Sequence, residues 1–272
     1  MTILVLGATG KTGRRLVAAL RAAGEPVRAA SRSAEVRFDW SDEDTWAAAL
    51  DGVSALYLVA PEDPGQAGTF VEQAAAAGVQ RIVALSARGL DQVPVGAFRG
   101  LVAAERAVRD SGLEWTVLRP NNFAQNFDEY SWREPLRSGR LALPIGPVPE
   151  PFVDVRDIAD VAAAALTSDG HHEQVYDLSG PRALTFAAAV ETISLAAGRP
   201  IRYEEVTPAE YRAELRGAGV PDEFVNDLDV LFAGLRAGHF AEPGDGVQRV
   251  LGREPVDFAT YAAEAAAAGA WT

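Results

Sequence analysis

Residues 2–13, TILVLGATGKTG, decide the fold class of this sequence. Thr2–Leu6 (TILVL) is a continuous apolar run, which is typical of a strand buried on both faces. Gly7–Gly13 (GATGKTG) is rich in glycine, and Arg14–Ala23 (RRLVAALRAA) then places apolar residues at helical spacing. A buried strand, a tight turn and an amphipathic helix in this order predict the start of a βαβ unit.

The same alternation continues to about residue 120. We predict further strands at Pro26–Ser31, Ala55–Val59, Arg81–Leu85 and Trp115–Leu118, each separated from the next by a helix. This rhythm predicts an α/β fold, in which a doubly wound parallel sheet carries helices on both faces. The rhythm breaks after residue 120, and we expect residues 121–272 to form a smaller cap over the sheet. Within it, residues 151–180 contain one more helix and strand and return to the sheet.

Composition narrows the possible functions. The 272 residues carry a net charge of −13 and no cysteine, which excludes disulfides and thiolate catalysis. Residues 121–272 hold 12 basic and 24 acidic side chains, so we expect no nucleic-acid partner. No apolar run approaches the roughly 18–20 residues of a membrane span, and three scattered histidines predict no metal site. We therefore expect a cytoplasmic protein that binds no membrane.

The glycine-rich turn predicts a dinucleotide site of the Rossmann type. Gly7 would make the tight turn off the strand, Gly10 would let the backbone approach a diphosphate, and Gly13 would let the helix pack closely on the sheet. The amides that open the helix would then meet the phosphates. The alternative is a glycine-rich structural turn without a ligand. Lys11 is misplaced for a nucleotide-triphosphate loop.

Cofactor selectivity should depend on the end of the second strand. An NAD-preferring site usually has a carboxylate there, whereas this sequence reads Ala29-Ala30-Ser31-Arg32-Ser33. Arg32 between two hydroxyls suits a 2′-phosphate, so we expect NADP(H) to be preferred, with NAD(H) possible. Asp39 and Trp40 end the next short strand, where an adenine ring would lie. A solvated arginine and a plain turn aspartate are the alternatives.

Several segments resemble the NmrA-like atypical short-chain dehydrogenase/reductases. They are Gly7–Gly13, Leu58–Pro61 (LVAP), Trp115–Asn126 (WTVLRPNNFAQN), Pro151–Thr167 (PFVDVRDIADVAAAALT) and Tyr176–Pro181 (YDLSGP). Relatives include quinone and ergot-alkaloid-type reductases, and also catalytically silent cofactor sensors. The resemblance implies a dinucleotide-binding domain at 1–120 and a substrate-binding cap at 121–272. It also implies cofactor contacts at Gly7, Thr9, Gly10, Lys11, Thr12, Gly13, Arg32, Val59, Pro61 and Ser86, with a nicotinamide-facing turn at Asn121–Phe123.

The sequence departs from ordinary short-chain dehydrogenases at the proton donor. Those enzymes use Tyr-x-x-x-Lys, in which the lysine lowers the pKa of the tyrosine. Lys11 is the only lysine here, and no tyrosine precedes it by four residues. A Tyr-x-x-x-Lys proton relay is therefore absent. Hydride transfer remains possible, because that chemistry belongs to the cofactor.

Aromatic residues after the sixth strand suggest the substrate side of the site. Phe123, Phe127 and Tyr130 fall at i, i+4 and i+7, one face of a predicted helix, with Trp132 nearby. We expect them to bind a flat hydrophobic substrate, although packing between cap and sheet is the alternative. Tyr130 is the candidate proton donor or hydrogen-bond partner, Asn122 could orient a carbonyl, and Ser86 stands where related folds keep a catalytic serine.

These observations predict an NAD(P)H-dependent oxidoreductase that transfers hydride to or from a hydrophobic, aromatic or quinonoid small molecule. One alternative is a non-catalytic NAD(P) sensor that binds a protein partner, which the missing proton relay would suit. A further alternative is an unusual cofactor-assisted oxygenation or tailoring enzyme. An enzyme should have an enclosed apolar pocket beside the nicotinamide, walled by Phe123, Phe127 and Tyr130. A sensor should leave that space filled or shallow and show an exposed apolar docking patch.

Overall fold

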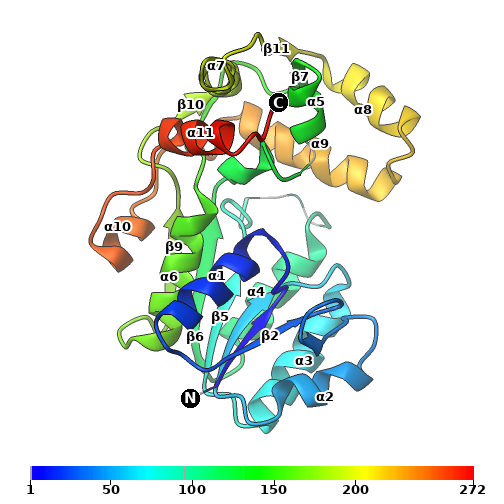
Figure 1. The fold of residues 1–272 in the computed structure, drawn as a ribbon. Coiled ribbons are helices and arrows are strands. Elements are labelled where there is room, and N and C mark those ends of the chain that lie inside the picture. The colour runs from blue at the N-terminus through cyan, green and yellow to red at the C-terminus, as the bar shows by residue number, and fades with distance from the viewer. Residues whose placement is uncertain (1, 93, 95, 131) are drawn as a thin grey trace.

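A computed structural model describes residues 2–92, 94, 96–130 and 132–272. Its centre is a parallel seven-stranded sheet in the order β3-β2-β1-β4-β5-β6-β9 (Figure 1). The strands are β1 (Ile3–Leu6), β2 (Val27–Ser31), β3 (Val36–Arg37), β4 (Ala55–Val59), β5 (Arg81–Leu85), β6 (Glu114–Pro120) and β9 (Gln174–Leu178). The order reverses beside β1, as in a doubly wound fold, so the predicted fold class is confirmed.

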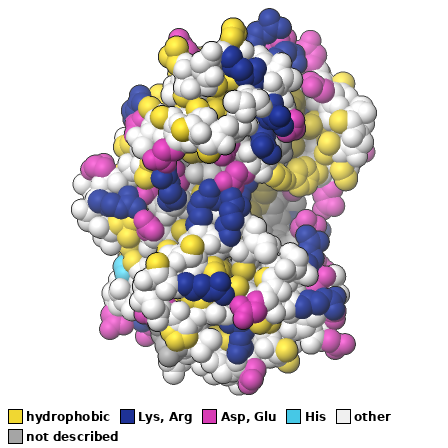
Figure 2. Space-filling view, in the orientation of Figure 1, with side chains coloured by type: hydrophobic (Ala, Val, Ile, Leu, Met, Phe, Trp, Pro, Cys, Tyr) yellow, Lys and Arg dark blue, Asp and Glu magenta, His cyan; other side chains and the backbone are white. Residues whose placement is uncertain are grey.

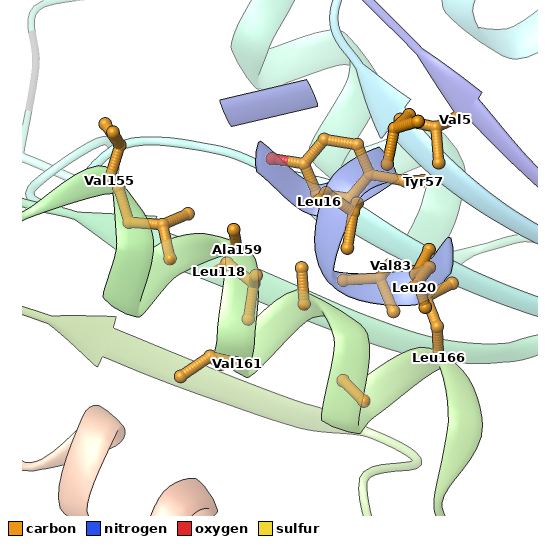
Figure 3. Packing of buried hydrophobic residues seen from close by; sticks show 14 of the residues in the cluster. Val5, Leu16, Leu20, Tyr57, Val83, Leu118, Val155, Ala159, Val161 and Leu166 are labelled. Carbon is orange, nitrogen blue, oxygen red and sulfur yellow. The ribbon is translucent and has the colours of Figure 1, made fainter. Parts of the chain in front are cut away.

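Helices cover both faces of this sheet, because side chains alternate along each strand. On β1, Ile3 and Val5 belong to the hydrophobic cluster that includes residues of α1 (Lys11–Ala22) and α6 (Val155–Thr167). Figure 3 shows Val5 in this cluster with Leu16 of α1 and Val161 of α6. Leu4 and Leu6 belong to the cluster on the other face, which is covered by α2 (Asp44–Leu50), α3 (Pro64–Ala76) and α4 (Arg99–Arg109). Every residue of β1 is buried, which explains the unbroken apolar run in the sequence.

A second lobe lies above the sheet in Figure 1 and has a hydrophobic cluster of its own. Two small sheets belong to it: parallel β7 (Arg140–Leu143) with β11 (Arg202–Glu205), and antiparallel β8 (Pro149–Glu150) with β10 (Leu184–Thr185). Its helices are η1 (Ala124–Asn126), α5 (Arg133–Arg137), α7 (Phe186–Ala197), α8 (Pro208–Gly217), α9 (Asp222–Arg236) and α11 (Phe258–Ala267). We refer to this group of elements as the cap.

One late segment does not follow the predicted division of the chain. Helix α10 (Gly246–Leu251) packs against α6 and β9 at the side of the sheet and not among the cap helices. Glycines make this approach possible, since a Cβ at Gly244 or Gly246 would lie 2.6 Å from the carbonyl oxygen of Asp177. Within the second half of the chain, only residues 151–180 were predicted to lie beside the sheet.

Candidate active site

The glycine-rich turn between β1 and α1 has the geometry of a diphosphate cradle. Gly7 has a positive φ of 62°, and its carbonyl oxygen accepts a hydrogen bond from Gly10 N at 2.8 Å. A Cβ at Gly13 would lie 2.2 Å from that same oxygen, so only glycine fits. Gly10 is the N-cap of α1, and no side chain among the described residues caps the helix. The amides of its first turn are therefore open to an anion, and the residues present fit a dinucleotide.

The other predicted cofactor residues lie around this turn, at the carboxyl ends of β2 and β4. Thr9 Oγ donates to Ser31 Oγ at 3.2 Å, which ties the turn to the end of β2. The side chain of Arg32 follows and is exposed. Val59 lies against Gly7, where an added Cβ would meet Val59 Cγ2 at 3.3 Å. Pro61 follows β4 and is buried, as is Thr12 in the first turn of α1.

Asp39 and Trp40, predicted to meet the adenine ring, are largely occupied by protein contacts. Asp39 accepts hydrogen bonds from Ser41 N at 3.1 Å and from Ser41 Oγ at 2.8 Å, and these hold the pKa of Asp39 below its usual value. The Trp40 ring meets those of Phe38 and Phe70 edge to face, with centroids 5.0 Å apart in both pairs. The adenine contacts remain a prediction.

Ser86, directly after β5, uses its hydroxyl within a buried ion pair. Its Oγ donates to Glu105 Oε2 at 2.7 Å, and Arg119 donates to Glu105 Oε1 at 2.6 Å. Burial opposes the ionisation of Glu105, but these hydrogen bonds outweigh it and lower the pKa of that carboxyl. The Ser86 proton is thus directed toward a carboxylate and away from a substrate, which favours a structural hydroxyl over a catalytic one.

The turn at residues 121–123 is held by a buried glutamate that the sequence analysis missed. Glu150 Oε1 accepts hydrogen bonds from Asn121 Nδ2 (3.0 Å), Asn122 N (2.9 Å) and Asn122 Nδ2 (3.1 Å). Asn121 Oδ1 accepts from Arg88, so the Asn121 carboxamide is engaged at both ends. Burial raises the pKa of Glu150, and its Oε2 is buried with no hydrogen-bond partner among the residues that the structure describes. In the sequence, Glu150 stands alone between Pro149 and Pro151, and this pattern did not indicate its role.

The prediction of one helix that carries Phe123, Phe127 and Tyr130 on one face is wrong. The chain forms only the short 3₁₀ turn η1, and Phe127 is fully buried. The Phe127 ring packs edge to face against those of Phe152 and Phe258 in the cap core, with centroids 5.2 and 5.3 Å away. Phe127 is therefore a packing residue, because burying its whole ring stabilises the cap more than half-exposure beside a ligand would.

Phe123, Tyr130 and Trp132 do line a cavity, which lies between the cap and the carboxyl ends of the strands. Its volume is about 840 Å³, and Figure 2 shows the molecule hollowed there, with hydrophobic side chains along the wall beneath α9. Lys11, Ser86, Asn121 and Asn122, which follow β1, β5 and β6, line it from the sheet side, and Glu150 of β8 lines it as well. Apolar residues of the α8–α9 region line the opposite side, among them Leu215, Phe224, Leu228 and Leu231.

Sequence reasoning also missed this apolar wall on α8 and α9. Phe224, Leu228 and Leu231 stand at i, i+4 and i+7, the spacing of one helix face, and could have been recognised. Three of the four predicted aromatic residues line the cavity, whereas Phe127 does not.

Lys11 reaches from the glycine-rich turn into the same cavity. Its Nζ lies 2.5 Å from Asn126 Oδ1 and 4.3 Å from the centroid of the Tyr130 ring. Burial lowers the pKa of Lys11 to about 8, although the charges of Glu129 and Asp128 oppose that shift. Lys11 thus joins the turn to the segment after η1.

The described part of the chain also lacks two features that would indicate other kinds of site. It contains no group of three or more His, Asp or Glu side chains arranged to hold a metal ion. His171 instead contacts the hydroxyl of Tyr176, with 2.9 Å between Nδ1 and the oxygen. No described helix has the length and apolar character that crossing a membrane requires.

Comparison with known proteins supports the interpretation of this chain as a dinucleotide-binding protein with a Rossmann fold. Residues 7–169 match a family described as NAD(P)H-binding. The chain is 34% identical over 286 residues to the NAD(P)H azoreductase of Xenophilus azovorans, covering 98% of this chain and 99% of that protein. The chain belongs to the NmrA-like atypical short-chain dehydrogenase/reductases and is an NAD(P)H-dependent oxidoreductase, as the sequence predicted.

Two solved structures share the fold over nearly the whole chain. The NADPH complex of the quinone oxidoreductase QOR2 from Escherichia coli has a TM-score of 0.79 and 24% identity, covering 96% of this chain and 99% of that one. NmrA, a negative transcriptional regulator solved with NAD, has a TM-score of 0.78 and 16% identity, covering 98% and 96%.

Proposed function

We propose that this protein uses NAD(P)H, with NADP(H) preferred, to reduce hydrophobic molecules of aromatic or quinonoid type. The observation that carries the proposal is the cavity of about 840 Å³, which is lined by Lys11 of the glycine-rich turn, by residues at the carboxyl ends of the strands and by apolar side chains of α9. A volume in this range accommodates drug-sized ligands. An open apolar cavity at this place favours an enzyme over the sensor alternative. The azoreductase and QOR2 relatives, named for azo and quinone substrates, support the same chemistry.

The chain would divide the work between its two lobes. Amides of the turn Gly7–Gly13 would hold the diphosphate, and Asn121–Phe123, fixed by Glu150, would flank the nicotinamide. When bound, the dihydronicotinamide supplies a hydride. Trp132 is nearly buried, whereas 57% of Tyr130 is exposed. Phe123, Tyr130 and Trp132, which all line the cavity, would bind a flat ring while the α9 wall excludes water.

Stopped-flow oxidation of NADPH against quinones and azo dyes tests this proposal directly. We expect single-turnover oxidation that saturates with the apolar acceptor, and little oxidation with small polar ketones. The control is NADPH binding, followed by its fluorescence in the same preparation. Tight NADPH binding with no acceptor turned over would contradict the proposed reaction and favour the sensor.

Arg32 tests the cofactor preference separately. Its exposed guanidinium follows the end of β2, where it can meet a 2′-phosphate. We expect Arg32→Ala to weaken NADPH binding roughly tenfold or more, a loss of about 1.4 kcal/mol, and to leave NADH binding nearly unchanged. Arg21→Ala is the matched control, because Arg21 is an exposed arginine paired with Glu35. If Arg32→Ala weakens the binding of NADPH and NADH equally, the assignment of Arg32 to the 2′-phosphate is wrong. Isothermal titration with each nucleotide measures the difference.

A further inference from the structure

Lys11, the only lysine in the sequence, lies where its ammonium group can donate a hydrogen bond to a molecule in the cavity. Lys11 is the first residue of α1, yet its side chain spans the cavity wall and contacts the segment after η1. Asn126 Oδ1 accepts one of its hydrogens at 2.5 Å, and the ammonium lies over the face of the Tyr130 ring. An ammonium carries three N–H donors. Within the described part of the chain no other acceptor contacts Nζ, so donor capacity remains for a molecule in the cavity.

We propose that Lys11 Nζ is the proton donor of the reduction, with the Tyr130 ring and Asn126 holding it in place. The assignment rests on the proposed function above. Lys11 would donate the proton that the Tyr-x-x-x-Lys relay, absent from this sequence, donates in ordinary short-chain dehydrogenases. As a quinonoid substrate takes up the hydride with its electron pair, an N–H bond of Nζ breaks and an O–H bond forms on the substrate oxygen. The ammonium becomes a neutral amine, which regains its proton from water.

The surroundings of Lys11 suit this exchange. Burial is the largest influence and lowers its pKa to about 8, and the charges of Arg14 and Arg15 act in the same direction. Glu129 and Asp128 act in the opposite direction. Glu129, however, also binds both arginines, with Arg15 at 2.6 Å, so much of its charge is already compensated.

Asp128 is compensated differently. It accepts a hydrogen bond from the hydroxyl of Tyr261 at 2.7 Å, and burial raises the pKa of Asp128. Neither acidic neighbour therefore holds the Lys11 proton firmly. A pKa near the working pH is what general acid catalysis requires, since the group must both carry and release its proton.

The competing role for Lys11 is a simple contact with the diphosphate of the cofactor. A phosphate partner would favour the charged form and return the pKa of Lys11 to its ordinary value near 10.4 or above. The two roles therefore predict opposite titration behaviour in the cofactor complex, and they can be separated without measuring turnover.

The sole lysine makes that titration direct. In protein labelled only with ¹³C-lysine, one side-chain NMR signal reports Lys11, because the sequence has no second lysine. We expect a midpoint near pH 8 in the free protein and a midpoint that stays below the ordinary lysine value in the NADP⁺ complex. A midpoint at or above 10.4 in the complex would overturn the assignment, because the amine would then be a phosphate ligand.

Kinetics with two kinds of acceptor provides the second arm. A quinone needs one proton besides the hydride, whereas an iminium ion or a triarylmethyl cation needs none. Lys11→Arg keeps a positive charge at this position but cannot release a proton near neutral pH. We expect Lys11→Arg and Lys11→Gln to lower kcat for the quinone about 100-fold at pH 7 and to change kcat for the cationic acceptor less than threefold.

Controls distinguish failure of this assignment from failure of the proposed function. Arg21→Gln removes an exposed charge from the same helix, outside the cavity, and should leave the reduction of both acceptors unchanged. Equal losses for quinone and cation in both Lys11 variants would overturn the proton-donor role while the reductase proposal stands. A quinone-specific loss in Tyr130→Phe would transfer the role to the Tyr130 hydroxyl. No turnover of either acceptor by the wild-type protein would instead contradict the reductase itself.

Discussion

Two regions that meet at the cavity are built on different principles: the glycine-rich turn, which contributes Lys11 to the lining, is the first wall, and the α8–α9 region is the second. On the sheet side, the turn Gly7–Gly13 is so closely packed that a single Cβ at Gly13 would lie 2.2 Å from a backbone oxygen. On the cap side, α8 has no buried residue, and 49% of the Phe224 side chain on α9 is exposed. Backbone geometry thus specifies one ligand group at the first wall, whereas the second offers apolar area that many flat molecules can share.

Between these walls lies the turn Asn121–Phe123, whose position depends on one carboxyl group. Three donors from Asn121 and Asn122 converge on Glu150 Oε1, and Glu150 itself is 1% exposed. Like the glycine-rich turn, this buried set of hydrogen bonds should tolerate few substitutions. We therefore expect substitutions to become less costly from the turn through Glu150 to the α9 wall.

The largest effect is expected for Gly13→Ala. The new methyl group would overlap the Gly7 carbonyl, so α1 must move away from β1, at a cost of about 3 kcal/mol in the free energy of unfolding. NADPH binding should be lost with it. Gly68→Ala on α3 is the matched control, because nothing lies within 4 Å of its added Cβ, and it should stabilise the protein by about 0.5–1 kcal/mol. Urea unfolding of both variants measures the contrast. Equal stability of the two would mean that the turn is not closely packed.

Replacing Glu150 should have the second largest effect. Glu150→Ala leaves the backbone N–H of Asn122 and two carboxamide donors without their acceptor, which should lower the free energy of unfolding by about 2 kcal/mol. Glu150→Gln keeps an oxygen at the Oε1 position and should lose much less. If both variants are equally destabilised, the hydrogen bonds to Oε1 are not what holds the turn.

The pH dependence of stability sharpens the same test. Burial raises the pKa of Glu150 in the folded protein above its value of about 4.3 in the unfolded chain. Between those two values the folded state binds more protons than the unfolded state, so this group makes stability fall as pH rises. Glu150→Gln should remove that loss, and its stability relative to wild type should therefore increase above pH 4.3. Denaturant titrations at several pH values measure this difference.

The sequence predicted the first wall and the sheet well, because both depend on local patterns. An unbroken apolar strand, three glycines and a helical period follow one another directly between residues 2 and 23. Phe127 was assigned to the wrong surface, since its partners Phe152 and Phe258 are distant in sequence. The contact of Lys11 with Tyr130 joins residues 119 positions apart and was likewise invisible. Where side chains from separate segments converge, periodicity carries no information about the partner.

The smallest effect is expected at the α9 wall. Phe224→Ala removes a half-exposed ring from the cavity lining, which should weaken binding of an apolar acceptor by about 1 kcal/mol and raise its KM roughly fivefold. The NADPH Kd should not change, because the glycine-rich turn lies at the opposite wall. Leu195→Ala is the matched control: Leu195 is 77% exposed on α7 and does not line the cavity. Steady-state kinetics with a series of quinones of increasing ring number should show a larger KM increase for the larger acceptors. A uniform increase across the series, or a weaker NADPH complex, would mean that the two walls do not act separately.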